Sequence, residues 1–354
     1  MLYFTLALIM LFFSVILEQF RNINLKLIAY ISIVFFLVLF AGLRGNIDPD
    51  YLNYKDIYDN AKVGINIGVE PAFFYFNKFI AYWGGDFQWV ILLMALFSIT
   101  LKINFFFNNS KNFAFSILIY YCSMFFLYDF IAIRQALAMA LFMISIPYLI
   151  DRKLLPYICF VGLASLVHIS ALVLLPLFFF IHYSYKKFIL YLILGLCTLV
   201  SVLKTDIQLV SIVLNYLSLP GFASDKLDIY AKEDVYAALS LRQLILGFIF
   251  VFLFSKRDDK IILALLNIYI LGIIVGTLLN EIPQLSFRLK AYFLWTESVL
   301  VVFYIHKIFK NYSLIRIFAY FLLTSLYIYS LYNYLDVLSQ RHVGFIYPYK
   351  TFFE

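Results

Sequence analysis

The chain is poor in charged residues, cysteine and proline. Of its 354 residues only 13% are charged, 3 are cysteine and 8 are proline. The cysteines all lie in apolar runs, with neither the spacing of a metal site nor that of a disulfide framework; they are Cys122, Cys159 and Cys197. We therefore expect them to be small apolar packing residues.

Motifs of several enzyme classes are missing as well. The sequence has no glycine-rich phosphate loop, no GxSxG and no HExxH. Its D-x-D string is Asp48-Pro49-Asp50, which the topology below places in a periplasmic loop and not in a cytoplasmic one. ATP-driven transport and nucleotide-sugar chemistry are thus disfavoured, and we expect no cofactor, no metal and no nucleic-acid partner.

Apolar and aromatic residues dominate instead. The chain is 65% hydrophobic and 21% aromatic, and apolar runs near 20 residues recur along it. Runs of this length match α-helices that cross a bilayer, whereas a β-barrel would need alternating segments of about ten residues. The sequence predicts an all-α polytopic integral membrane protein, in contact with membrane lipids, forming one domain over residues 1–354.

About 12 membrane helices are expected, including short or re-entrant ones. The first apolar run lacks a basic leading region and a cleavage site, so we interpret it as a helix and not as a signal peptide. The segment 154–182 is long for one span and has His168 at its middle, which predicts two short helices with a bend there. The other predicted spans are 2–17, 25–43, 87–101, 113–129, 132–150, 188–203, 242–254, 261–280, 291–306 and 314–335.

The charges predict an orientation. With the bend at His168, one orientation places an excess of lysine and arginine, Lys102 and Arg316 among them, in cytoplasmic loops, as the positive-inside rule requires. Both termini and the loops at about 44–86 and 204–241 then face the periplasm across the bacterial inner membrane. Within the first loop, the aromatic and amphipathic segment VEPAFFYFNKFIAYW is expected to lie along the membrane interface.

A group of polar residues falls on this outer half. Arg134 is the strongest indication, because a lone guanidinium inside a membrane-spanning run costs roughly 2.5 kcal/mol or more and must face a cavity, a partner or the interface. The group comprises Arg44, Asp48, Asp50, Tyr51, Tyr54, Glu70, Arg134, Gln135, His168, Arg242 and Arg288. Some of these residues could instead have purely structural roles. Arg44 could extend to the membrane surface, Asp48-Pro49-Asp50 could form an ordinary turn, and His168 could be a core residue.

Several arginines near one cavity indicate a polyanionic ligand. Guanidinium groups bind phosphate oxygens in pairs and keep their charge at any usable pH. Because the cavity would open at the bilayer, the ligand should also reside in the membrane. A lipid-linked diphosphate is both polyanionic and membrane-resident. The carboxylates and aromatic rings of the outer loops suit a sugar, whose hydroxyls donate to carboxylates and whose faces stack on rings.

These residues resemble the EpsG and Wzy-like family of bacterial polysaccharide polymerases. The resemblance covers roughly residues 40–300 and rests on the order and spacing of five motifs. They are GLRGNIDPDYLNY, GVEPAFFYF with Glu70, IRQALAMAL with Arg134, LVHISALVLLP with His168 and FRLKAYFLW with Arg288. The family often has G-x-D-x-x-x-Y in its first loop, where this chain has an extra proline.

The resemblance implies a membrane glycosyltransferase related to the GT-C group. Donor and acceptor would both be undecaprenyl-diphosphate-linked oligosaccharides, joined on the periplasmic face, and a chain-length regulator protein is a further expected partner. Arg134 and Arg288 would stabilise the leaving diphosphate, supplemented by Arg44 and Arg242. His168 would be the general base, since an unperturbed histidine titrates near pH 6.5, with Asp50 and Glu70 as rivals. Asp48, Tyr51, Tyr54 and Gln135 would contact substrate.

Two other functions fit parts of the pattern. An O-antigen ligase uses the same donor with a lipid A-core acceptor, but ligases usually have a larger periplasmic loop than 204–241. A lipid-linked oligosaccharide flippase should carry charges through both halves of the bilayer, whereas most polar residues here gather on one side.

The topology can be tested by labelling. Cysteines placed at Asn60 and Ser224 should react with a membrane-impermeant thiol reagent in intact cells, and one at Asp259 should not. The prediction follows from the excess of cations expected in the cytoplasm. The reverse pattern of labelling would overturn both the orientation and the periplasmic placement of the site.

Overall fold

The computed structural model describes residues 2–20, 22–181, 185–203, 241–280, 282–341 and 348–354. Every regular element within these ranges is a helix, and the predicted all-α polytopic membrane fold is confirmed. Seven of the described helices are long and apolar enough to cross a membrane: Leu2–Gln19, Ile23–Gly42, Phe87–Asn109, Phe113–Ile131, Ile133–Ile150, Lys260–Leu278 and Ser313–Gln340. Shorter apolar helices cover Leu154–Val167, Ile169–Phe180, Lys187–Leu203 and Leu241–Leu253.

The chain packs as two compact units. Unit 1 comprises Met1–Leu175 and Val301–Glu354, and unit 2 comprises Pro176–Leu300. Each unit is described by itself below. A single polytopic domain stays a prediction, as does the relation to the GT-C group, and residues 204–240 of the second predicted outer loop lie outside the described residues.

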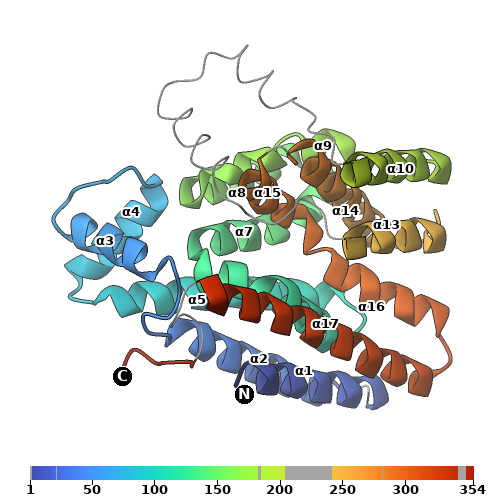
Figure 1. Ribbon diagram of the computed structural model, residues 1–354, viewed down its shortest axis with the longest axis horizontal. Helices are drawn as coiled ribbons and strands as arrows, with labels where there is room; N and C mark the ends of the chain where they lie inside the picture. Colours follow the sequence, from blue (N-terminus) through green and yellow to red (C-terminus); the bar gives the residue numbers. More distant parts are fainter. Residues whose placement is uncertain (1, 21, 182–184, 204–240, 281, 342–347) are drawn as a thin grey trace, which may run out of the picture. The chain divides into compact units, whose positions relative to one another are not determined.

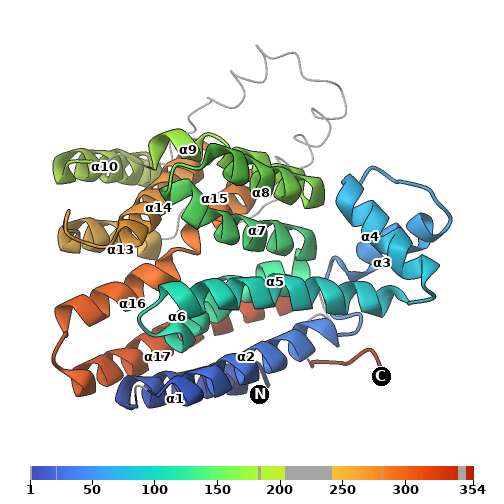
Figure 2. The same ribbon diagram turned by 180° about the vertical axis from the view of Figure 1, so that it is seen from behind.

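Long helices form the centre of unit 1. In Figures 1 and 2, α5 (Phe87–Asn109) lies between α2 (Ile23–Gly42) and α7 (Ile133–Ile150). Polar side chains mark where such helices begin: Asn22 accepts a hydrogen bond from the backbone N–H of Asn24 at the start of α2, and Asp86 accepts one from Trp89 at the start of α5. These caps satisfy backbone donors that have no partner within the helix.

One membrane-length helix changes its winding partway along. Residues Phe113–Tyr120 form α6, and the same helix continues as a π-helix, η1 (Tyr121–Ile131). Ala132 then leaves helical geometry, with φ −84° and ψ 62°, and α7 begins at Ile133. A π-helical stretch is rare and is often associated with functional sites.

Two short helices, α3 (Tyr51–Lys62) and α4 (Pro71–Tyr82), form a hairpin at one end of unit 1 (Figure 1). Helix α4 buries Phe73, Phe74, Asn77 and Ile80, whereas Tyr75, Phe79, Tyr82 and Trp83 are exposed. The aromatic amphipathic segment is therefore a helix with an outward aromatic face. Its placement at the membrane interface stays a prediction.

The predicted bend at His168 is confirmed. Helix α8 (Leu154–Val167) ends where His168 adopts an extended conformation, with φ −152° and ψ 113°, and the 3₁₀-helix η2 (Ile169–Leu174) follows directly. The Tyr157 hydroxyl donates to the backbone carbonyl of Leu174 at 2.5 Å and so ties the two arms of this bend together.

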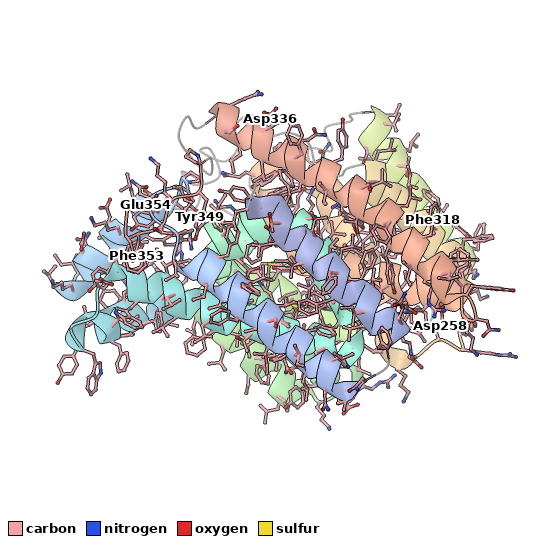
Figure 3. All side chains as sticks on the ribbon, turned by 90° about the horizontal axis from the view of Figure 1, so that it is seen from below. Asp258, Phe318, Asp336, Tyr349, Phe353 and Glu354 are labelled. Carbon is pink, nitrogen blue, oxygen red and sulfur yellow. The ribbon has the colours of Figure 1, made fainter. Side chains whose placement is uncertain are left out.

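The C-terminal helix packs against the first helix. Figure 3 shows α17 (Ser313–Arg341) beside α1 (Leu2–Gln19), with Phe318 and Asp336 towards its two ends. Phe318 is exposed, as expected of a helix face that meets lipid. The chain beyond α17 reaches the end of α2: the N–H of Gly45 donates to the carbonyl of Lys350, and the N–H of Phe352 donates to that of Leu43.

Unit 2 contains α9 (Leu177–Phe180), α10 (Lys187–Leu203), α13 (Leu241–Leu253), α14 (Lys260–Leu278) and α15 (Pro283–Leu294). Helices α14 and α15 pack closely at Gly272, where an added Cβ would lie 2.7 Å from the Cβ of Phe293. No larger residue fits this contact without a shift of the helices.

The predicted span 291–306 is wrong in detail. It is two helices, because α15 ends at Leu294 and α16 (Glu297–Ile308) begins after a break. The Thr296 and Ser298 hydroxyls donate back to the carbonyls of Phe293 and Trp295, and such local bonds compete with a continuous helix. Arg288 consequently lies within a helix and not before one.

Lys102 does not lie in a cytoplasmic loop. It is buried within α5, which extends eight residues past the predicted end of the span at 101, and it pairs with Asp129, an anion that the predicted topology placed on the opposite side. Neither residue can therefore report a membrane face. Elsewhere in unit 1, Glu18 meets Arg316 and Arg44 meets Thr351, and the orientation in the membrane stays a prediction.

Candidate active site

The carboxylate of Glu70 binds groups from two other parts of the chain. Its Oε2 accepts a hydrogen bond from Nη1 of Arg134 at 2.5 Å, forming an ion pair. Its Oε1 lies 3.1 Å from Nδ1 of His168 and accepts the backbone N–H of Ile169, also at 3.1 Å. Three residues that the sequence predicts for the site are thus brought together, although 64 and 98 positions separate Glu70 from its two partners.

Each of these side chains stands at the end of a helix. Glu70 immediately precedes Pro71, the first residue of α4, where proline's missing N–H costs nothing. Arg134 lies in the first turn of α7, just after the break at Ala132. His168 ends α8, and its extended backbone turns the N–H of the next residue, Ile169, towards the Glu70 carboxylate.

Aromatic rings surround the guanidinium of Arg134. Its central carbon lies 5.7 Å from the centre of the Tyr54 ring and 5.6 Å from that of Phe73. Tyr54 is buried, and burial raises the pKa of its hydroxyl to about 12, although the charge of Arg134 acts in the opposite direction. The tyrosine is therefore neutral at physiological pH, and the guanidinium faces two uncharged aromatic rings on this side.

Glu70 is held in its ionised form. Partial burial alone would raise its pKa, but the hydrogen bond with His168, the charge of Arg134 and the N–H of Ile169 together lower it to about 2. An ionised carboxylate only accepts hydrogen bonds, so Nδ1 of His168 must carry the proton that it shares with Glu70. In the neutral imidazole the basic lone pair is then on Nε2.

Arg44 and Asp48 form a separate, fully buried ion pair. Nε of Arg44 lies 2.8 Å from Oδ2 of Asp48, and Nη1 donates to the carbonyl of Ala41 at 2.7 Å. The guanidinium also lies 5.0 Å from the ring centre of Phe130. The structure places both residues inside the fold, so a role in substrate binding, which stays a prediction, would require this pair to open.

The remaining predicted residues of unit 1 lie around the start of α3 and of α7. Asp50 precedes α3, and its N–H donates to Oδ1 of Asp48 at 3.0 Å. Tyr51 is half-buried, with its ring 5.2 Å from that of Phe87. Gln135, next to Arg134, is buried. None of these three is directly bonded to Glu70 in the contacts described above, and their substrate roles stay predictions.

Arg242 and Arg288 belong to unit 2. Arg242, at the start of α13, forms an ion pair with Glu297 in which Nη1 lies 3.1 Å from Oε1. Arg288 lies on α15. The sequence interpretation left Glu297 outside the outer polar group, and the pairing with Arg242 now provides it with a partner.

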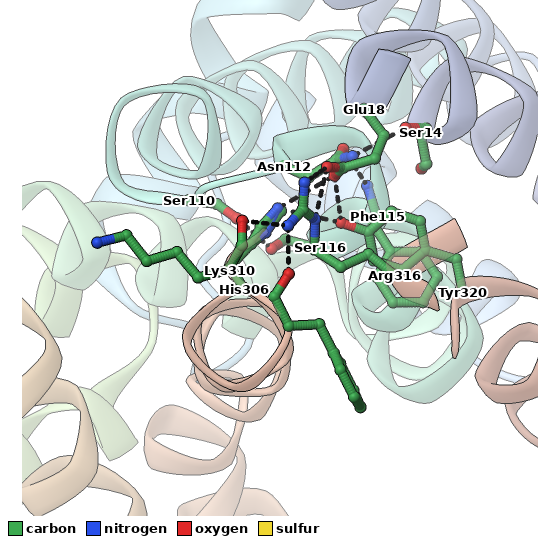
Figure 4. A network of polar contacts seen from close by, with 11 residues as sticks. Ser14, Glu18, Ser110, Asn112, Phe115, Ser116, His306, Lys310, Arg316 and Tyr320 are labelled. Atoms are coloured by element: carbon green, nitrogen blue, oxygen red, sulfur yellow. Dashed lines mark hydrogen bonds and ion pairs between the residues drawn. The ribbon is translucent and has the colours of Figure 1, made fainter. Parts of the chain in front are cut away.

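Two buried networks were missed from the sequence. Figure 4 shows the first, in which Glu18 on α1 binds Arg316 and Tyr320 of α17 and lies 3.1 Å from Nε2 of His306 on α16. In the second, Asp129 accepts hydrogen bonds from Ser98, Lys102 and Tyr120. Opposite charges inside apolar runs were the available signal, since an unpaired charge is not tolerated there.

Membrane-length apolar helices that enclose paired charges define a polytopic helical membrane protein. Over residues 27–351 the chain matches the EpsG family, and it belongs to that family. This membership supports a polysaccharide-polymerase-like function in a membrane protein of polysaccharide biosynthesis. Comparisons with curated proteins and with solved structures gave no match.

Replacing Glu70 with glutamine should destabilise the protein near neutral pH. The substitution removes the partner of a partly buried arginine, and we expect the free energy of unfolding to fall by about 1–3 kcal/mol. Asp59→Asn, on the exposed face of α3, is the matched control. Thermal unfolding of the purified protein in detergent measures the difference.

The pH dependence of that difference follows from the pKa of Glu70. Because its pKa is lowered to about 2 in the folded protein, its contribution is fully present above the unfolded value of 4.5 and is lost as the pH falls towards 2. The difference between wild type and Glu70→Gln should not decrease between pH 8 and pH 5, and it should increase where His168 becomes protonated, because the imidazolium pairs with the Glu70 carboxylate. A difference that decreases as the pH falls across this range would contradict the assignment.

Proposed function

We propose that the protein is a membrane glycosyltransferase that polymerises oligosaccharide repeat units linked to undecaprenyl diphosphate, on the periplasmic face of the inner membrane. One observation carries the proposal: a single carboxylate, that of Glu70, joins a histidine and an arginine in one partly buried cluster. A sugar transfer from a diphosphate needs a proton acceptor and a stabilised leaving group close together, and this cluster supplies a candidate for each.

His168 is the proposed general base. The acceptor hydroxyl oxygen attacks the anomeric carbon of the donor, and its proton passes to Nε2 of His168. Glu70 holds the ring by Nδ1 and stabilises the imidazolium that forms, as the carboxylate of a catalytic triad does. A carboxylate with a pKa of about 2 is itself a weak base, so Glu70 is assigned the orienting role.

The arginines are the proposed partners of the leaving group. As the bond between the anomeric carbon and the diphosphate oxygen breaks, its electron pair stays on that oxygen. Arg134, whose side chain is 22% exposed, can keep the bond from Nη1 to Glu70 and present Nη2 to the diphosphate, whereas its Nε is buried. Arg288 is the second proposed partner. Arg44 and Arg242 are proposed only as supplements: Arg44 is fully buried against Asp48, and Arg242 is paired with Glu297.

Alanine at Arg134 or Arg288 should abolish polymerisation while leaving protein abundance near that of wild type. The lost charge stabilisation is worth roughly 3–4 kcal/mol, or a factor of 10² to 10³ in rate, if it resembles one oxyanion donor. Lysine should rescue poorly, because one ammonium group cannot replace a two-pronged guanidinium. Arg257→Ala, at an exposed loop position, is the control.

The measurement is incubation of the purified protein with lipid-linked repeat units, followed by sizing of the products. A lengthening ladder supports a polymerase; transfer to a core acceptor alone would indicate a ligase, and transbilayer movement alone a flippase. Full activity in either alanine variant would remove that arginine from the mechanism.

Activity should be independent of divalent cations, because arginines supply the positive charge at the diphosphate. Excess EDTA in the same assay should leave product length unchanged. Loss of activity that magnesium or manganese restores would instead indicate a metal held by carboxylates, with Asp48, Asp50 and Glu70 as the first ligands to examine, and would remove His168 as the base.

A further inference from the structure

The carboxylate of Asp129 is the centre of the second of the two networks that the sequence did not predict. Its Oδ1 accepts hydrogen bonds from the Ser98 hydroxyl at 2.6 Å and from Nζ of Lys102 at 2.7 Å. Its Oδ2 accepts from Nζ of Lys102 at 2.9 Å and from the Tyr120 hydroxyl at 2.5 Å. All four side chains are buried.

The network joins two membrane-length helices. Ser98 and Lys102 are one turn apart on α5, Tyr120 ends α6, and Asp129 lies on the π-helix η1. A buried pair of charges often adds little stability compared with apolar residues of similar volume, and its best-attested use is to fix register. Three of the four bonds to the carboxylate come from Ser98 and Lys102 on α5, and they fix both the rotation of η1 and its position along α5.

Arg134 follows Asp129 by only five residues. The N–H of Ala132 donates to the carbonyl of Leu127 at 2.9 Å, which is the wide spacing of a π-helix, and Ala136 donates to Ala132 at the start of α7. No Pro or Gly lies between Asp129 and Arg134 to enforce this geometry. If η1 relaxed by one residue to ordinary α-helical winding, the chain after it would rotate by about 100° and shift by about 1.5 Å.

We infer that Lys102 and Asp129 are positioning residues: by fixing the register of η1 against α5, they place Arg134 against Glu70. The inference deepens the proposed function, since Arg134 is one of its site residues. It assigns a use to an ion pair in the membrane-spanning region that touches neither sugar nor diphosphate, and it explains why the π-helical winding lies immediately before α7.

The test combines charge removal with a direct measure of where Arg134 lies. Cys122, Cys159 and Cys197 are replaced by alanine, and the reporter pair Glu70→Cys and Arg134→Cys is added. A short bifunctional thiol reagent then links the two cysteines, and the linked peptides are quantified by mass spectrometry. Lys102→Leu with Asp129→Leu removes both charges together. The matched control removes the exposed pair, Asp151→Leu with Lys153→Leu.

We expect the control to cross-link at the rate of the reporter background, and the Lys102→Leu/Asp129→Leu protein to cross-link at least fivefold more slowly at unchanged abundance and thermal midpoint. Ser98→Ala removes one hydrogen bond from α5 to Asp129 without leaving a charge unpaired, and should slow cross-linking by about twofold to threefold. If the double variant does not accumulate, Ser98→Ala decides. Cross-linking at the background rate in whichever of these variants fold would overturn the inference.

Polymerisation is measured separately, in proteins that keep Glu70 and Arg134. A loss of at least tenfold in the double variant, together with reduced cross-linking, supports the inference and the proposed function. Reduced cross-linking with undiminished polymerisation would still support positioning of Arg134, and would count against a role for Arg134 in the reaction. The two ideas can therefore fail independently.

Discussion

A carboxylate among apolar helices requires partners, and the arrangement of unit 1 around its candidate site depends on one such carboxylate, that of Glu70. It connects the α3–α4 hairpin to the start of α7 and to the bend after α8 through Arg134, His168 and the N–H of Ile169. If any of these segments moved away, an arginine or a carboxylate would lose its partner in surroundings of low polarity. The demand for neutralisation thus brings together three segments that are distant in sequence.

The same bonds also determine the protonation states of Glu70 and His168. Hydrogen bonding and the positive charge of Arg134 keep Glu70 ionised, and the ionised carboxylate in turn determines which nitrogen of His168 carries a proton. In its proposed role as a base, His168 would need no rearrangement before it accepts a proton, which is the condition under which a fixed electrostatic environment aids a reaction. The contacts that stabilise the cluster would then also serve the proposed reaction.

The sequence predicted much of the helical framework, because hydropathy and charge act locally. The helix ends near 17, 43 and 150 and the bend at His168 follow from single apolar runs and the polar residues that interrupt them. Pairings across the fold could not be obtained in this way. Lys102 was taken as the end of a span because a lysine alone cannot be buried; it is buried because Asp129, 27 residues away, neutralises it.

In the candidate site, too, the residue types could be predicted from the sequence but their pairings could not. Glu70, Arg134 and His168 could be named from their residue types and surroundings, but their direct contact depends on tertiary packing. Arg44 was expected to face a cavity, and the i, i+4 spacing to Asp48 was a sign, not used, that the two could pair instead. The winding of η1 has no sequence signature that would have indicated it.

The isolated bridge between Arg44 and Thr351 affects how the protein folds while its own chain is being synthesised. The loop that leads from α2 into α3 is held by backbone bonds to Lys350 and Phe352, and the carbonyl of Thr351 lies 2.8 Å from where a Cβ on Gly45 would be. During translation this loop is made some three hundred residues before residues 350–352, to which it bonds. Since chains fold progressively during synthesis, the loop after α2 can complete these backbone bonds only after residues 350–352 have been made.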